Sequence, residues 1–181
     1  RERAARIAVA ARSSNTDQRC VSLERIYIHT DVYDAFIAAF VRRTDDLTLA
    51  SGIGWGADMG SLISAKQLQR ISEHVDDAVA QGARVLAGGR PRPDVGPFFY
   101  EPTILADVTR DMILSFTETF GPVVSVYRVD SVEEAIERTR PDVVCLDYNL
   151  PCRDGISILE SVQALAPQID VLLMSAANDI D

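Results

Sequence analysis

Hydrophobic and polar residues alternate along the chain with two different periods, and these predict strands and helices in turn. Short runs that alternate or are rich in β-branched residues predict strands at residues 24–29, 83–87, 98–105, 123–129, 142–147 and 170–175. Runs with apolar residues three and four positions apart predict helices at residues 3–11, 32–47, 64–79, 132–139 and 155–165. Ser64 is suited to cap the third helix, and Gly82 to follow its end. Strands that alternate with helices predict an α/β fold in three layers, with helices flanking a mainly parallel sheet.

The composition is that of a globular chain, but its charge is unevenly distributed. Of 181 residues, 47% are hydrophobic and 25% are charged, which fits one domain, or one domain with part of another. The formal net charge of −9 argues against nucleic acid as a partner, because phosphate binding needs a basic face. Residues 141–181 carry seven acids and one base, so they contribute −6 of that charge. This shift predicts a boundary between two parts near residue 140.

The sequence lacks the signals of several protein classes. No stretch reaches the roughly 18 apolar residues of a membrane span, and the first residues lack the apolar core of a secretory signal. Because the first residue is Arg1 and not methionine, we expect the chain to begin inside a longer reading frame. Neither a disulfide framework nor a structural zinc site fits the odd set of cysteines and the two distant histidines: Cys20, Cys145, Cys152, His29 and His74. We therefore expect a cytoplasmic protein that binds no membrane and no structural metal.

Cys20 is a candidate for chemistry, because it lies in a polar loop between a predicted helix and a predicted strand. A cysteine in such a loop is exposed enough to react, and Arg19 and Arg25 could favour its thiolate. The alternative is a small, half-buried thiol without a chemical role, and position alone favours that alternative.

Five motifs together make the first part of the chain resemble a known family. The pattern Asn15-x-x-Gln18-x-Cys20, followed by a strand, resembles the nucleophile segment of the aldehyde dehydrogenase family. Four further segments resemble the family in the same order: residues 58–64, 80–89, 100–103 and 118–123. Within the family, the residues of these motifs most resemble those of the succinate-semialdehyde dehydrogenases. Residues 1–138 are therefore identified as a partial aldehyde dehydrogenase catalytic domain.

The resemblance implies a role for three residues. Cys20 would attack the carbonyl of a small aldehyde, hydride would leave to the nicotinamide of NAD or NADP, and water would hydrolyse the resulting thioester. Glu118 would hold the nicotinamide ribose through its hydroxyls, and Phe120 would lie beside the nicotinamide. The alternative for Glu118 is a solvated loop acid. The residues of the motifs favour succinate semialdehyde as the aldehyde.

Two departures from the family pattern bear on activity. Asp17 stands where the family usually has glycine, and a carboxylate there would raise the thiol pKa and crowd a tight turn. The resemblance also places the general-base glutamate, the oxyanion-stabilising asparagine and the nucleotide-binding half before Arg1. We therefore expect little or no dehydrogenase turnover from this chain alone.

Residues 139–181 resemble a different family, the receiver domain of response regulators. Residues 141–151 resemble its third strand and residues 171–176 its fourth. The resemblance implies that Asp147 accepts a phosphoryl group from a histidine kinase with Mg²⁺ bound, and that Ser175 is the switch hydroxyl. A receiver also needs an acidic pair for Mg²⁺ and a lysine, which these residues lack, so an unmodified acid at a strand end is the favoured alternative for Asp147.

Three hypotheses of function therefore stay open. The chain could oxidise an aldehyde through Cys20, accept a phosphoryl group on Asp147 as part of a two-component system, or be an inactive structural chimera. In the third case the receiver-like strands would extend the dehydrogenase sheet. The sequence leaves open the origin of the junction, the choice between NAD and NADP, and the oligomeric state, a homo-oligomer included.

Overall fold

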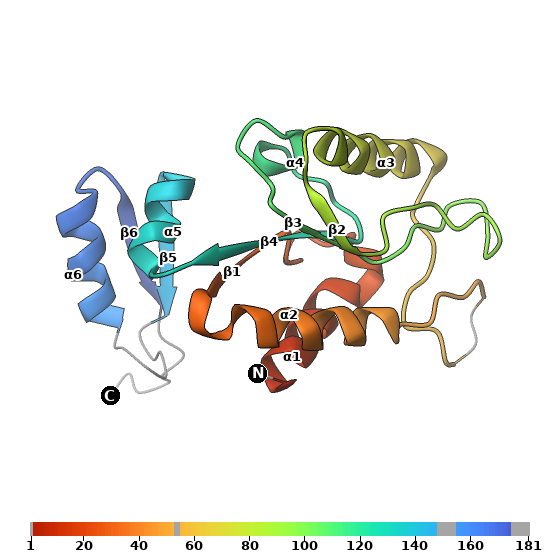
Figure 1. Ribbon diagram of the computed structural model, residues 1–181, viewed down its shortest axis with the longest axis horizontal. Coiled ribbons are helices and arrows are strands. Elements are labelled where there is room, and N and C mark those ends of the chain that lie inside the picture. The colour runs from red at the N-terminus through yellow and green to blue at the C-terminus, as the bar shows by residue number, and fades with distance from the viewer. Residues whose placement is uncertain (1, 53–54, 148–154, 175–181) are drawn as a thin grey trace. The chain divides into compact units, whose positions relative to one another are not determined.

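Helices and strands alternate along the chain as the hydrophobic pattern predicts (Figure 1). The computed structural model describes residues 2–52, 55–147 and 155–174. These residues form two compact units, Arg1–Arg128 and Val129–Asp181. The first unit contains α1 (Glu2–Ser13), the 3-10 helix η1 (Ser14–Asp17), β1 (Arg25–His29), α2 (Thr30–Asp45), α3 (Ala65–Ala80), β2 (Arg84–Ala87), β3 (Thr103–Ala106), α4 (Ile113–Phe116) and all but the last residue of β4 (Val123–Val129). The second unit contains α5 (Val132–Thr139), β5 (Val143–Asp147), α6 (Gly155–Leu165) and β6 (Asp170–Met174).

A four-stranded sheet in the order β1-β4-β3-β2 forms the centre of the first unit. β3 and β4 are parallel, whereas β2 is an antiparallel edge strand. All of β3 and the first four residues of β4 are buried. This is why both strands appear in the sequence as continuous apolar runs, as expected of strands covered on both faces.

Successive residues of β3 and β4 point to opposite faces of the sheet, and each face has its own hydrophobic core. Ile104 and Val124 pack with Phe40 and other side chains of α1 and α2. Leu105 and Val123 pack with side chains of α3 and α4, of which Ile71 is fully buried. Figure 1 shows these helix pairs on opposite sides of the sheet. The predicted three-layer α/β fold with a mainly parallel sheet is confirmed.

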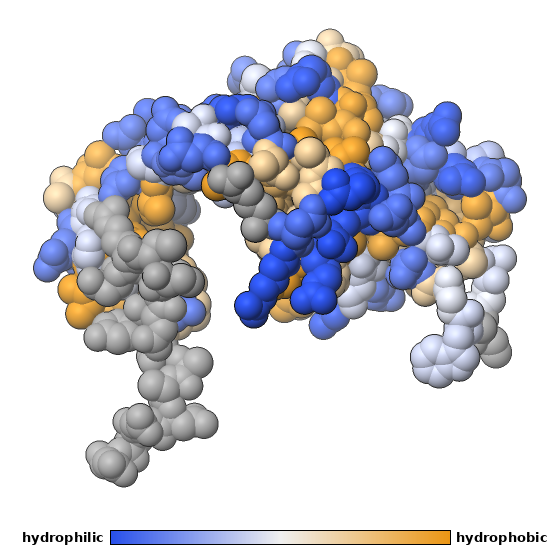
Figure 2. Space-filling view, turned by 60° about the horizontal axis from the view of Figure 1, so that its bottom comes forward, coloured by the Kyte–Doolittle hydropathy of each residue, from blue (hydrophilic) through white to orange (hydrophobic). Residues whose placement is uncertain are grey.

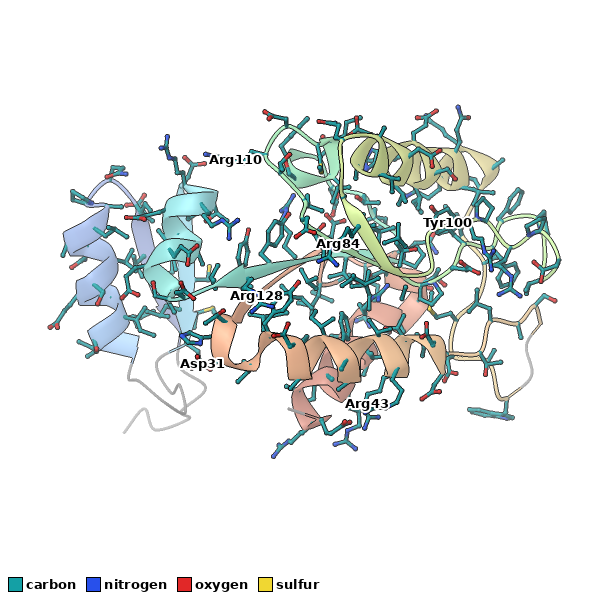
Figure 3. All side chains as sticks on the ribbon, in the orientation of Figure 1. Asp31, Arg43, Arg84, Tyr100, Arg110 and Arg128 are labelled. Carbon is teal, nitrogen blue, oxygen red and sulfur yellow. The ribbon has the colours of Figure 1, made fainter. Side chains whose placement is uncertain are left out.

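Polar side chains fix the ends of these elements. The Ser64 hydroxyl accepts a hydrogen bond from the Gln67 amide at 3.2 Å, so Ser64 caps α3 as predicted. Gly82 follows the helix with a φ of +104°, a conformation that glycine adopts without strain. Near the end of β4, Arg128 bonds Asp34 of α2 at 2.5 Å and lies 4.1 Å from the centre of the Tyr33 ring (Figure 3).

The second unit has a separate two-stranded sheet. β5 and β6 are parallel, with Val143 opposite Asp170 and Asp147 opposite Met174. Its small core contains the buried residues Ile136, Leu146, Ile158, Val162, Ala166 and Ile169. Among the described residues, β5 and β6 form a sheet of their own, so the hypothesis that they extend the dehydrogenase sheet gains no support.

No helix in the described ranges combines the length and the apolar character that crossing a membrane requires. Much of the face seen in Figure 2 is hydrophilic, and apolar side chains reach it in separate patches. The most exposed apolar side chains of the first unit are Val21, Trp55, Ile63 and Phe116.

Candidate active site

Cys20 lies in a turn that follows a strained left-handed segment, and we call residues 14–22 the Cys20 loop. The Ser22 amide donates to the Arg19 carbonyl at 3.1 Å and closes the turn around Cys20, whose side chain is exposed. Three consecutive residues before it have positive φ: Asn15 (54°), Thr16 (56°) and Asp17 (61°). Such angles are unfavourable for residues with a Cβ, so the surrounding contacts must hold the loop.

A second loop, residues 58–64, provides some of those contacts. The Thr16 hydroxyl donates to the Gly60 carbonyl at 3.2 Å. The Gln18 side-chain oxygen accepts from the Ile63 amide at 2.9 Å, and its nitrogen donates to the Ser61 carbonyl at 3.4 Å. The first two sequence motifs, 40 residues apart, are therefore joined by direct hydrogen bonds.

The last of the five motifs forms a turn at residues 118–121, and side chains hold its backbone from two directions. One carboxylate oxygen of Glu24 accepts from the amides of Thr119 and Phe120 at 2.9 and 2.8 Å. The side-chain nitrogen of Gln67 donates to the carbonyls of the same two residues at 2.9 and 2.8 Å. Phe120, half-buried and predicted to face a nicotinamide, has a φ of +56° in this turn.

Two further α3 side chains contact the turn. Arg70 donates to the carbonyl of Glu118, whose side chain is exposed, as an acceptor of ribose hydroxyls must be. His74 Nδ1 lies 3.2 Å from the hydroxyl of the buried Thr119. Burial lowers the pKa of His74, and Arg70 lowers it further, so the ring is neutral near pH 7.

These contacts connect three distant segments in a closed circuit. The Cys20 loop bonds to the 58–64 loop, which leads into α3. Side chains of α3 hold the 118–121 turn, and Glu24 connects that turn back to the chain just after Cys20. The sequence identified Cys20, Glu118 and Phe120, which this circuit places in joined segments. It missed Glu24 and Gln67. The spacing Ser64-x-x-Gln67 is typical of a capping box, but the Gln67 side chain bonds the distant turn and not its own helix end.

Arg12 of α1 and Asp17 of the Cys20 loop are two buried residues of opposite charge. Arg12 and Asp17 each expose only 1% of their surface. Arg12 donates to the carbonyls of Thr103 and Pro122 at 3.1 and 2.9 Å, whereas neither Asp17 oxygen has a hydrogen-bond partner among the described residues. Burial raises the pKa of Asp17 to about 7, although the Ser22 hydroxyl and Arg12 oppose the rise. Asp17 thus occupies a left-handed position suited to glycine, and a large part of it is protonated at neutral pH.

Neither arginine expected to activate Cys20 has a described contact with the thiol. Arg19 donates to the Ser14 hydroxyl at 2.9 Å. Arg25 donates to the Leu114 carbonyl at 3.2 Å. The hydrogen bonds of these two side chains therefore lead away from Cys20, and the idea that they favour its thiolate gains no support.

The remaining predicted residues lie in the second unit. Asp147 is the last residue of β5 and is exposed. Ser175 lies outside the described residues. In the described parts of the chain, no group of three or more His, Cys, Asp or Glu side chains could hold a metal ion.

A polar pocket of about 360 Å³ lies elsewhere in the first unit. Its walls include Thr44 in the last turn of α2 and Leu47 just after the helix, together with Arg90, Arg92 and Glu101. Glu101 pairs with Arg90 at 3.0 Å, so the charges there compensate each other. None of the predicted site residues lines this pocket, and the joined motifs identify the site better than its volume does.

Comparisons with known proteins agree on one family for this arrangement. The model of the aldehyde dehydrogenase family matches residues 1–146. A provisionally named succinate-semialdehyde dehydrogenase [NADP(+)] from Mycolicibacterium smegmatis is 53% identical over 170 residues, 92% of this chain and 33% of the relative. A Mycobacterium bovis protein with a similar provisional name is 47% identical over 180 residues, 99% of this chain and 33% of its own length. The chain thus spans about a third of the length of these relatives.

Solved structures give the same result. An aldehyde dehydrogenase from Bacillus cereus, in an NAD⁺ complex, superposes with a TM-score of 0.74 at 29% identity, covering 95% of this chain and 35% of that one. None of these comparisons supports a receiver domain in residues 139–181. The joined motifs, the family match and the fold lead to one conclusion: this chain belongs to the aldehyde dehydrogenase family.

Proposed function

We propose that this chain carries the nucleophile and the nicotinamide-facing part of an aldehyde dehydrogenase that acts on succinate semialdehyde or a similar small aldehyde. The observation that supports the proposal is the hydrogen-bonded circuit that joins the segment of Cys20 to the turn of Glu118 and Phe120 through the 58–64 loop, Gln67 and Glu24. The names of the mycobacterial relatives support the choice of substrate.

In the proposed chemistry, the Cys20 thiolate adds to the carbonyl carbon of the aldehyde and forms a thiohemiacetal. NAD or NADP, when bound, supplies the hydride acceptor. Glu118 accepts hydrogen bonds from ribose hydroxyls, and Phe120 lies beside the nicotinamide ring. The exposed positions of Cys20 and Glu118 fit these roles, because both must meet a ligand.

We also propose that residues beyond these 181 are needed for turnover. Within the described ranges no histidine or carboxylate is hydrogen-bonded to Cys20, so the thiol has no attached base. Exposed apolar side chains lie in or beside each site segment: Val21, Ile63 and Phe116. Surfaces of this kind are typical of sites that contact a further protein part or a ligand.

A protection experiment tests Cys20 without requiring turnover. The purified chain is treated with iodoacetamide, with and without succinate semialdehyde, and labelling is quantified at each cysteine by peptide mass spectrometry. We expect the aldehyde to slow labelling of Cys20 in a saturable way, because the thiohemiacetal occupies the thiol. Cys145, also exposed, is the internal control. Equal protection of both cysteines, or protection by succinate itself, would refute the assignment of Cys20.

A further inference from the structure

Glu24 holds two parts of the 118–125 segment at once. Its side chain accepts from the amides of Thr119 and Phe120, and its main-chain carbonyl accepts from the Ser125 amide at 2.9 Å. Ser125 belongs to β4 and is fully buried. A single residue, four positions after Cys20, therefore bonds both to the turn and to the strand that follows it.

We propose that Glu24 is a positioning residue that fixes the backbone of Phe120 relative to Cys20. The inference rests on the proposed function, because it gives Phe120 and Cys20 a shared task, and it adds a residue that the sequence motifs did not identify. Glu24 would contact neither the aldehyde nor the cofactor. It acts by holding the turn that carries their contacts.

The geometry is that of an anion held by consecutive backbone amides. Successive N–H groups beside a residue of left-handed conformation converge on one point and form a small concave site for negative charge. Here the Thr119 and Phe120 amides converge on one oxygen of Glu24, at 2.9 and 2.8 Å, and Phe120 has the left-handed φ of +56°. The protein's own carboxylate fills the site.

Contacts on the opposite side of the turn also restrain the orientation of its peptide groups. The amide nitrogen of Gln67 donates to the carbonyls of the same two residues. An acceptor on the amide side and a donor on the carbonyl side define one direction for these peptide groups. A reversal of either peptide would turn a carbonyl toward the Glu24 carboxylate, which can only accept, and would oppose like dipoles there.

This restraint matters because a left-handed non-glycine residue is unstable on its own. Without the carboxylate, the Phe120 backbone would relax toward negative φ and its ring would move relative to Cys20. Positioning of reacting groups is sensitive to shifts of this size. Charge-assisted hydrogen bonds are about twice as strong as neutral ones, so the charge of Glu24, and not only its shape, should count.

Hydrogen exchange measured by NMR on the full chain tests the proposal. We expect the Thr119 and Phe120 amides to lose about tenfold or more of their protection in Glu24→Ala, and a smaller part in Glu24→Gln. The matched control is Glu134→Gln, because Glu134 also accepts from a backbone amide, that of Asp130 at 2.6 Å, in the second unit. That variant should leave Thr119 and Phe120 unchanged.

The exchange rates of the β3 amides are the reference, because they report whether the first unit is folded. Should Glu24→Ala unfold, the isosteric Glu24→Gln gives the result by itself. Unchanged protection of Thr119 and Phe120 in a folded Glu24→Ala chain overturns the proposal, and so does full protection in Glu24→Gln.

A spectroscopic readout separates positioning from stability. With 4-fluorophenylalanine at position 120, the ¹⁹F resonance should be single and narrow in the parent chain, shifted or broadened in Glu24→Ala, and intermediate in Glu24→Gln. The aldehyde protection of Cys20 is measured on the same samples. Loss of that protection in the parent chain would reject the proposed function and leave the Glu24 result intact, whereas a ¹⁹F signal indifferent to both substitutions would reject the role of Glu24 alone.

Discussion

Parallel β3 and β4 in the first unit and parallel β5 and β6 in the second are alike in sequence but unlike in environment. Val123–Val126 of β4 are all buried. In the second unit, Leu172 and Met174 of β6 are 57% and 52% exposed. Both sets have the apolar, β-branched character that predicts a strand, so that character does not determine burial. Burial depends on cover: β3 and β4 lie between two hydrophobic cores, whereas β5 and β6 contact one small core.

The two units also differ in the chemistry assigned to them. The residues assigned to aldehyde chemistry lie in the first unit, where buried strands hold the segments that carry them. A two-stranded sheet is marginal without further packing, so the second unit should depend more on its surroundings.

Truncation of a core residue should distinguish the two units most strongly. Phe40 is fully buried in the core between the sheet and α1 and α2. Phe40→Ala should lower the free energy of unfolding of the first unit by about 3–5 kcal/mol, whereas Leu172→Ala in β6 should cost less than about 1 kcal/mol. Native-state hydrogen exchange of β3 and β6 amides in urea measures each unit separately. Similar losses from the two substitutions would show that the exposed strand is covered in solution.

Buried charge is the second property that distinguishes the first unit. The pKa of Asp17 rises from 3.8 to about 7, so the unfolded chain ionises more readily than the folded one, and stability falls as the pH rises between these values. The isosteric Asp17→Asn should therefore stabilise the first unit by roughly 4 kcal/mol at pH 8 and by little at pH 4, at about 1.4 kcal/mol per pKa unit. The net rise in pKa means that the burial cost exceeds the attraction of Arg12.

Urea unfolding at the two pH values, followed through the β3 amides, provides the measurement for Asp17→Asn. Glu2, exposed and paired with Arg42 and Arg43, provides the control, because Glu2→Gln removes a carboxylate outside the core. A gain for Asp17→Asn that is the same at pH 4 and pH 8 would show that ionisation of Asp17 is not its cause.

The sequence predicted most of the helices and strands, but not the short helices η1 and α4 or the contacts of the site. Periodicity depends on nearby residues, so it located α2, α3 and β4 and indicated the caps at Ser64 and Gly82. The family motifs then identified Cys20, Glu118 and Phe120. The roles of Glu24 and Gln67 depend on partners about 95 and 50 residues away, which no local pattern records. The burial of Asp17 is likewise a property of the folded chain, and the spacing around Cys20 gave no sign of it.

Close packing at the 118–121 turn predicts a third, smaller effect. A Cβ added at Gly121 would overlap Cδ1 of Ile71 and lie 2.9 Å from its Cγ1. Because Ile71 is fully buried in α3, Gly121→Ala should destabilise the first unit by about 1–3 kcal/mol and shift the ¹⁹F resonance of a label at position 120. Gly60→Ala is the matched control, since no atom lies within 4 Å of a Cβ at that position. Equal effects of the two substitutions would argue against a packed contact between the turn and α3.

The smallest effect should come from His74, and it has the opposite pH dependence from that of Asp17. Burial lowers the pKa of His74 from 6.5, and Arg70 adds to this, whereas Glu24, Asp77 and Glu73 oppose it. The unfolded chain therefore binds the proton more tightly, so this contribution to stability is complete above about pH 6.5 and is lost as the pH falls below it. His74→Gln, which keeps a donor for the Thr119 hydroxyl, should lose this dependence on pH. The free energy of unfolding is measured for the parent chain and for His74→Gln between pH 5 and pH 8. The difference between the two chains isolates the effect of His74, because Asp17 is present in both. A difference that does not change with pH would mean that His74 is as readily protonated in the folded unit as in the unfolded chain.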